Sequence, residues 1–191
     1  VFASLAVIII HQIYFVQTGP FLSDIGIKDS QIGPAMTIGQ FAEIVTMAYL
    51  GYFLKRLGFK KVLCIGVLAY FARYAIFGTV ILPVWVMVLS QAFHGFCYAF
   101  FFAAAYIYVD KIADEDVRHS AQTVFGIIIL GGGPVIGGWL SGKLQEIYTT
   151  SGIFDYSGFW YTLSAIGLVT GLLFFFLFSN QLEDCLLYTS D

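Results

Sequence analysis

The sequence predicts an all-α membrane protein with six transmembrane helices. Hydrophobic residues make up 59% of the 191 residues, charged residues only 11%, and the mean hydropathy is +0.85. A soluble globular domain carries roughly 25% charged residues. The apolar residues also form blocks of about 20 residues, the length that a helix needs to cross hydrocarbon, and not the roughly ten-residue alternating segments of an outer-membrane barrel.

Polar or turn-forming segments separate these apolar blocks. Segment 23–30 is polar, and segment 55–61 carries four basic residues. The separation at 79–84 depends on Pro83 and on the fact that a single helix through both neighbouring blocks would be too long for one crossing. Segments 110–120 and 145–157 are again polar. The six predicted spans are 2–22, 31–54, 62–79, 84–109, 121–144 and 158–178.

Composition excludes several classes of function. The net charge is −3 and no basic tract is present, so binding to nucleic acid has no support. Cys64 and Cys97 lie in apolar spans, and no spacing typical of metal ligands joins the cysteines to histidines. We therefore expect no metal and no cofactor. Val1 lies within an apolar run and lacks a charged flank, so we expect the chain to be a fragment.

The basic residues of the short loops predict the orientation, because loops rich in Lys and Arg stay in the cytoplasm. The 55–61 loop carries four of them, and the 110–120 loop lies on the same side and adds two more. The opposite loops offer only Lys28 and Lys143. An even number of spans then places both termini in the cytoplasm.

One acidic residue lies inside an apolar span. Glu43 interrupts the otherwise uncharged block 31–54, where a charge near the bilayer centre costs at least about 2.5–3.5 kcal/mol. Gln40 precedes it by three residues, so both side chains share one face of a helix. We expect the pair to line a polar cavity. The alternative is a hydrogen-bonded contact between helices, worth about 0.6–2 kcal/mol.

Other spans carry further unusual residues. Arg73 lies near the outer end of its span, so we expect it to snorkel or to pair with a neighbour. Gly133 and Gly137 form a small-xxx-small face for close helix contact, and Pro134 favours a kink that a moving transporter can use. The tryptophans near span ends are expected interfacial anchors. They are Trp85, Trp139 and Trp160.

Segment 51–61, GYFLKRLGFKK, combines a helix end with a glycine and two basic pairs. It resembles the loop motif of the major facilitator superfamily, which joins the second and third helices of each six-helix half. Here it lies between the second and third predicted spans. The usual acidic residue of the motif is Lys55 in this chain, which weakens any gating salt bridge at that position. The motif positions are Gly51, Arg56, Gly58 and Lys60.

Three ordered motifs resemble the second half of a nucleoside:proton symporter of that superfamily. They are Gln12-Ile13 with Gly-Pro-Phe-Leu at 19–22, Gln-Phe-Ala-Glu at 40–43, and His-Gly-Phe-Cys-Tyr at 94–98. The resemblance implies that residues 1–180 are the C-terminal six-helix half of a twelve-helix carrier in the bacterial inner membrane, and that the N-terminal half is missing. Residues 181–191 form a tail, in which 185–191 resemble a translated sequencing adapter.

The resemblance also implies a nucleoside cavity near the membrane midplane. Amides and a carboxylate suit ribose hydroxyls and base nitrogens, and aromatic rings suit a flat base. The family commonly carries an aspartate at the position of Ala99, so Glu43 is the best remaining proton carrier. A facilitator without proton coupling is the alternative. The substrate-contacting positions of the family fall on Gln12, Gln40, Glu43, His94 and Tyr98.

The same residues also fit two other functions. Gln and Glu also suit hydroxyl-rich ligands, so a carrier for sugars or another polar solute is the nearest alternative. A structural membrane subunit belongs to a different class. An enzyme is not expected, because the sequence contains no metalloprotease motif and no recognisable nucleophile and base set.

Overall fold

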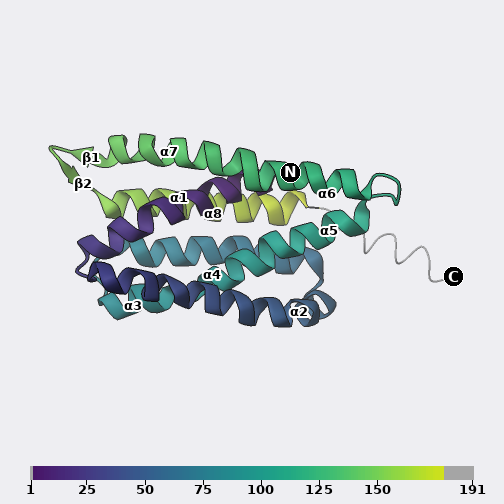
Figure 1. Cartoon of the computed structure of the whole chain (residues 1–191), viewed down its shortest axis with the longest axis horizontal. Coiled ribbons are helices and arrows are strands. Elements are labelled where there is room, and N and C mark those ends of the chain that lie inside the picture. The colour runs from purple at the N-terminus through teal and green to yellow at the C-terminus, as the bar shows by residue number, and fades with distance from the viewer. Residues whose placement is uncertain (1, 179–191) are drawn as a thin grey trace.

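Long helices that run side by side form almost all of the protein in the computed structural model, which describes residues 2–178 (Figure 1). The predicted tail, 181–191, lies outside these residues. Within the described part, five continuous helical segments are long and apolar enough to cross a membrane. The expected all-α membrane fold is therefore confirmed.

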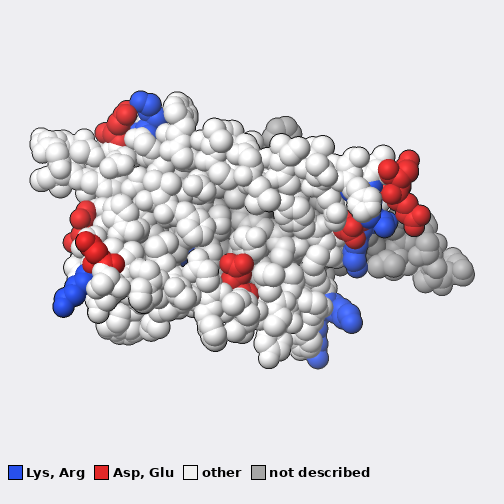
Figure 2. Space-filling model, in the orientation of Figure 1, with Lys and Arg blue, Asp and Glu red and all other residues white. Residues whose placement is uncertain are grey.

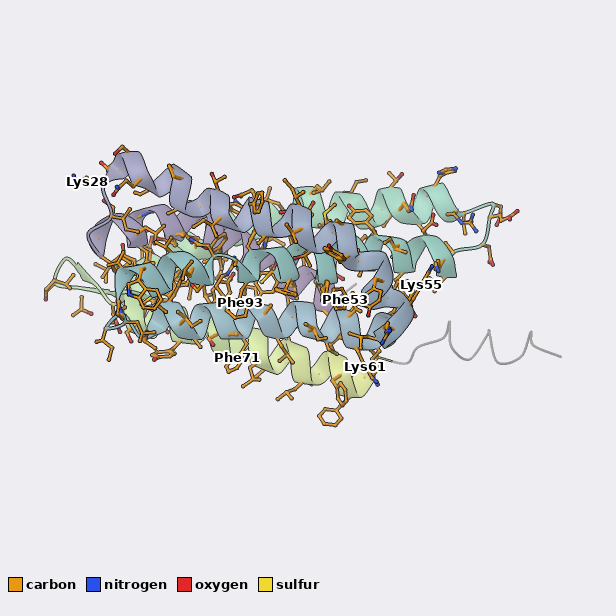
Figure 3. The ribbon with its side chains drawn as sticks, turned by 90° about the horizontal axis from the view of Figure 1, so that it is seen from below. Lys28, Phe53, Lys55, Lys61, Phe71 and Phe93 are labelled. Atoms are coloured by element: carbon orange, nitrogen blue, oxygen red, sulfur yellow. The ribbon has the colours of Figure 1, made fainter. Side chains whose placement is uncertain are left out.

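The first two helices contain three of the six predicted spans. α1 covers Phe2–Asp24 and α2 covers Asp29–Gly78. A straight helix of 50 residues would be about 75 Å long, more than twice the roughly 30 Å of bilayer hydrocarbon. α2 is instead broken at Gly58, where φ is 76° and ψ is 167°. Its first half (29–57) runs from Lys28 to Lys55, and its second half (59–78) returns past Lys61 and Phe71 (Figure 3).

The remaining three crossings follow the predicted bounds to within a few residues. The fourth consists of α3 (Val84–Ser90), α4 (Phe93–Gly95), η1 (Phe96–Ala103) and α5 (Ala104–Ile112). The fifth consists of α6 (Arg118–Gly126), η2 (Ile127–Gly132) and α7 (Gly133–Tyr148). The sixth is α8 (Tyr156–Leu177). Elements η1 and η2 are π-helical, and such wider turns often occur at functional sites.

A short hairpin joins the last two crossings, where the sequence indicated only a polar connection. β1 (Thr149–Thr150) pairs antiparallel with β2 (Ile153–Phe154). The two residues between them, Ser151 and Gly152, have φ values of 53° and 80°, as in a type I′ turn. The Asp155 side chain then caps α8 by accepting a hydrogen bond from the Gly158 N–H at 3.0 Å.

The second half of α2 lies at the centre of the bundle, where α8 and η1 pack against α2, while α7 packs against α1. Trp160 is fully buried, and its ring lies 5.0 Å from that of Phe77 and 5.6 Å from that of Tyr74. The prediction that Trp160 is an interfacial anchor is therefore wrong. Trp85 and Trp139 are 65% exposed, which suits that role.

Charged side chains gather at the two ends of the molecule, and the face between them carries few charged atoms apart from acidic ones midway along it (Figure 2). Lys28 lies at one end, and Lys55 and Lys61 lie at the other (Figure 3). The Lys60 ammonium lies 5.1 Å from the centre of the Phe175 ring, and Lys111 lies 5.6 Å from that of Phe59. The 55–61 loop and the end of α5 therefore share one side of the bundle, as the predicted crossings require.

Candidate functional site

Two glycines bring the first half of α2 against α4. A Cβ atom at Gly95 would lie 2.5 Å from the carbonyl carbon and oxygen of Ala42 and 2.8 Å from the backbone nitrogen of Glu43. A Cβ atom at Gly39 would lie 3.1 Å from the Cβ of His94. The two helices thus touch through their backbones, which only residues without a side chain allow. This contact sets Glu43 and His94 side by side.

The Glu43 carboxylate and the His94 imidazole meet at this crossing. Glu43 Oε2 lies 3.7 Å from His94 Nε2, and the side chains are 23% and 2% exposed. At this separation the pair is an electrostatic contact and not a hydrogen bond. Figure 2 also shows acidic atoms midway along the face, between the charged ends. Glu43 is therefore partly open to the outside of the described bundle, and His94 lies beneath it.

Arg73 lies deeper still and contacts His94 from the other side. The guanidinium is fully buried, and its Nη1 lies 3.0 Å from His94 Nδ1. It stacks on the Tyr14 ring, 3.8 Å from the ring centre. Tyr74 OH lies 3.5 Å from Nη2. The expectation that Arg73 snorkels to the membrane surface is wrong, because a snorkelling side chain ends in water; the expectation that it pairs with a neighbour is confirmed.

Aromatic and amide side chains surround His94 and Arg73. His11 stacks on His94 with ring centres 5.2 Å apart, and its Nδ1 lies 2.7 Å from the Tyr70 hydroxyl. Tyr14 donates a hydrogen bond of 2.7 Å to Gln91 Oε1. These bonds join helices that are far apart in sequence and satisfy polar groups that lipid cannot solvate. We call Glu43, His94, Arg73, His11 and Tyr14 the central cluster.

Tyr98 comes from the π-helical segment η1. His94 and Tyr98 are four residues apart, but they do not share one face as they would on an α-helix, because a π-helix turns less per residue. Tyr98 is partly buried, and its ring centre lies 6.2 Å from that of His11. Ala99, which follows it, is fully buried.

Gln40 and Gln12 take separate positions. Gln40 is exposed on the first half of α2, one residue after the contact of Gly39 with His94. Gln12 is partly buried and lies against Gly137 of α7, where an added Cβ atom would be 2.7 Å from the Gln12 Cβ. The structure therefore brings Glu43, His94 and Tyr98 to one region together with His11, whereas Gln12 packs at the interface of α1 with α7.

The predicted conformational residues lie at helix contacts and breaks. Gly133 approaches Ile8 of α1, and Gly137 approaches Gln12, so the small face of α7 is in contact with α1. Pro134 lies at the point where η2 passes into α7. Gly58 forms the break in α2 and has a backbone conformation that is essentially restricted to glycine. Their role in a transport cycle stays a prediction.

The other loop-motif residues surround that break. Gly51 lies in the first half of α2 with open space around it, and the Arg56 guanidinium lies 5.2 Å from the centre of the Tyr52 ring. Lys60 contacts the Phe175 ring of α8. Within residues 2–178, no three His, Cys, Asp or Glu side chains are grouped to hold a metal ion.

Comparisons with known proteins point to one family. A sequence model of the nucleoside H⁺ symporter family matches residues 1–183. The nucleoside permease NupG of Escherichia coli is 32% identical over 154 residues, which cover 76% of this chain and 36% of NupG. The Escherichia coli protein YegT is 32% identical over 181 residues, which cover 90% of this chain and 42% of YegT.

A solved structure agrees with the sequence comparisons. The crystal structure of the nucleoside transporter NupG matches with a TM-score of 0.81 and 28% identity, over 93% of this chain and 47% of that one. The chain thus spans less than half the length of these relatives.

Proposed function

The chain belongs to the nucleoside H⁺ symporter family, and on this premise we propose that it forms one half of a carrier that moves nucleosides across a membrane together with protons. The relatives are more than twice as long as the matched part, so the complete carrier requires a second half. That half corresponds to the N-terminal portion of the same protein. The two halves would enclose the substrate near the membrane midplane.

The position of Glu43 carries this proposal. Its carboxylate interrupts the otherwise uncharged segment 31–54, lies 3.7 Å from His94, and keeps 23% of its side-chain surface exposed. A carboxylate facing lipid would be costly, whereas one facing a water-filled cavity between two halves would not. Gln40 is exposed three residues earlier on the same helix. Together they offer three acceptor oxygens and an amide donor to a hydroxylated ligand.

Each predicted contact has a distinct role in this proposal. Gln40 and Glu43 hold ribose hydroxyls or base nitrogens, and the partly buried Tyr98 ring packs against the base. Gln12 packs against Gly137 of α7 with the base of its side chain, and in this proposal its partly buried amide end reaches the cavity from α1. His94 is only 1% exposed, so it acts on the substrate through Glu43 from the layer beneath.

Glu43 is also the proposed proton carrier. Ala99 is fully buried and brings no titratable group to η1, and the other carboxylates of residues 2–178 belong to the ends of the helices or the loops. Burial in a low dielectric favours the protonated form of a carboxylic acid, which a symporter needs for loading and release. The exposed part of Glu43 gives such a proton a path to the cavity.

The distribution of basic residues supports an orientation. Lys55, Arg56, Lys60 and Lys61 lie at the end of the bundle that also carries Lys111. Because basic loops tend to stay inside, this distribution supports the proposal that this end, and both termini of the chain, lie in the cytoplasm of a bacterial inner-membrane protein.

Uptake by the full-length protein tests the function. Cells that lack their own nucleoside carriers would express it, and uptake of tritiated uridine would be measured with an excess of unlabelled nucleosides or of sugars. We expect nucleosides to compete and sugars to have no effect. Competition by sugars alone would favour the carrier for another polar solute.

Two substitutions test the site within the same assay. Gln40→Ala and Glu43→Ala should each reduce uridine uptake about tenfold or more, because each removes a hydrogen-bonding partner from a desolvated ligand. Lys143→Ala changes an exposed side chain that pairs with Glu146 and serves as the matched control. Wild-type uptake in both cavity variants would support a structural membrane subunit.

A further inference from the structure

The Arg73 guanidinium is a buried charge without an acidic partner. It is fully buried, and within residues 2–178 no carboxylate oxygen lies within 4.0 Å of its nitrogens. The titratable groups that face it are tyrosine hydroxyls, a thiol and imidazoles. They come from α1 (His11 and Tyr14), the second half of α2 (Tyr70 and Tyr74), α4 (His94) and η1 (Cys97). A charge in this position is costly, so a function is expected for it.

The contact between Arg73 and His94 fixes where the imidazole carries its proton. Arg73 Nη1 lies 3.0 Å from His94 Nδ1, and a guanidinium can only donate hydrogen bonds. His94 Nδ1 must therefore accept, which excludes both the imidazolium form and the tautomer with a proton on Nδ1. The proton of the neutral ring then lies on Nε2. This nitrogen is the one that faces Glu43 Oε2 at 3.7 Å.

The three residues form an ordered chain from the core to the exposed face. Arg73 and His94 are buried, whereas Glu43 is 23% exposed. Arg73 reaches Glu43 through the imidazole, which stacks with His11 and with Tyr14, whose ring centres lie 5.2 and 5.5 Å away. The ring is thus held by two stacking neighbours and at Nδ1, so its Nε2–H keeps a fixed direction toward the carboxylate.

We infer that Arg73 is a positioning residue for nucleoside binding, which holds His94 as the neutral Nε2–H tautomer and thereby orients the Glu43 carboxylate. The inference rests on the proposed function. In this arrangement one carboxylate oxygen faces His94, and the other is left for the substrate. It also assigns the mobile proton to Glu43, because His94 cannot take a second proton while Arg73 occupies Nδ1.

The tautomer can be read in the unmodified protein. Full-length carrier labelled with ¹⁵N-histidine would be reconstituted in lipid, and the His94 signals would be assigned by their loss in His94→Gln. We expect an unprotonated, pyridine-type signal for Nδ1 and a protonated, pyrrole-type signal for Nε2. A protonated Nδ1 would overturn the inference, and this measurement does not depend on whether any Arg73 variant folds.

Binding of tritiated uridine and adenosine tests the functional part. Arg73→Met should weaken nucleoside binding about tenfold, the effect of misplacing one hydrogen bond to a charged group. Lys143→Met removes an exposed positive charge and should leave the affinity unchanged. In a His94→Leu background, Arg73→Met should cause no further loss, because the pathway through the imidazole is already absent.

The binding results distinguish a failure of the proposed function from a failure of the role of Arg73. A wild-type protein that binds neither nucleoside contradicts the proposed function. A wild-type protein that binds, together with an Arg73→Met variant of unchanged affinity, contradicts only the role of Arg73. Losses that add in the Arg73→Met/His94→Leu double variant would show that Arg73 acts independently of His94, and would also overturn the inference.

Discussion

The backbone contact at Gly95 gives the sharpest prediction about the site. A Cβ atom there would lie 2.5 Å from the carbonyl carbon and oxygen of Ala42, whereas carbon atoms in good contact are about 3.5 Å apart. Gly95→Ala therefore requires α4 and the first half of α2 to separate by about 1 Å. The neighbours are backbone atoms, so no side chain can rotate out of the way.

Two losses follow from that separation. Overpacking of this kind costs about 1–3 kcal/mol, so the thermal unfolding midpoint of the full-length protein in detergent should fall by several degrees. The Glu43 and His94 side chains would also move apart, and uridine binding should weaken about tenfold.

The matched control for this prediction is Gly138→Ala in α7, because a Cβ atom at Gly138 would meet nothing within 4 Å. That variant should keep both the unfolding midpoint and the affinity. Equal behaviour of the two variants would refute the reasoning, because only one of them faces a backbone. A Gly95→Ala variant that loses stability but binds uridine normally would separate the packing from the site.

Three further predictions concern the fold and share the same readout, the thermal unfolding midpoint of the full-length protein in detergent. Gly58→Ala should destabilise by about 1–3 kcal/mol, since φ is 76° there, and Gly51→Ala should not. Trp160→Ala should cost about 3–5 kcal/mol because the ring is fully buried, while Trp139→Ala, at a 65% exposed position, should be nearly neutral. Asp155→Ala should cost about 1 kcal/mol by removing the cap of α8, whereas Asp155→Asn should keep most of the stability, because its amide oxygen can still accept the capping hydrogen bond. Equal midpoints within any of these pairs would contradict the corresponding argument.

Much of the fold follows from the sequence because lipid imposes one requirement on every span. A crossing segment must be apolar and about 20 residues long, so hydropathy, together with Pro83 and the length limit of one helix, predicts the six crossings to within a few residues. The break at Gly58 was predicted by the basic loop around it. The hairpin after α7 was not, because its two positive φ values belong to Ser151 and Gly152 and leave no hydropathy signal.

The candidate site was only partly predictable. Glu43 stood out because a charge in an apolar span is unusual, but sequence position gives depth along a helix and not the direction of a side chain around it. Arg73 was therefore placed near the surface, although it points into the core. No sequence pattern indicates a role for His11, yet it stacks on His94.

The partners of these residues lie too far along the chain for spacing to reveal them. Tyr14 and Gln91 are separated by 77 residues, and His11 and Tyr70 by 59. The one accessible signal was the pair of intramembrane charges at Glu43 and Arg73, since two such charges in one small bundle are expected to be connected. Here the connection runs through His94.

Proton-driven accumulation of a nucleoside tests the central claim most directly. Full-length wild-type protein and Glu43→Gln would be reconstituted in liposomes with an imposed pH gradient, inside alkaline, and uptake of tritiated uridine would be followed with and without the gradient. We expect the wild type to accumulate uridine only with the gradient, and the Glu43→Gln variant to lose this response. Gradient-driven accumulation by Glu43→Gln at the wild-type level would contradict the account.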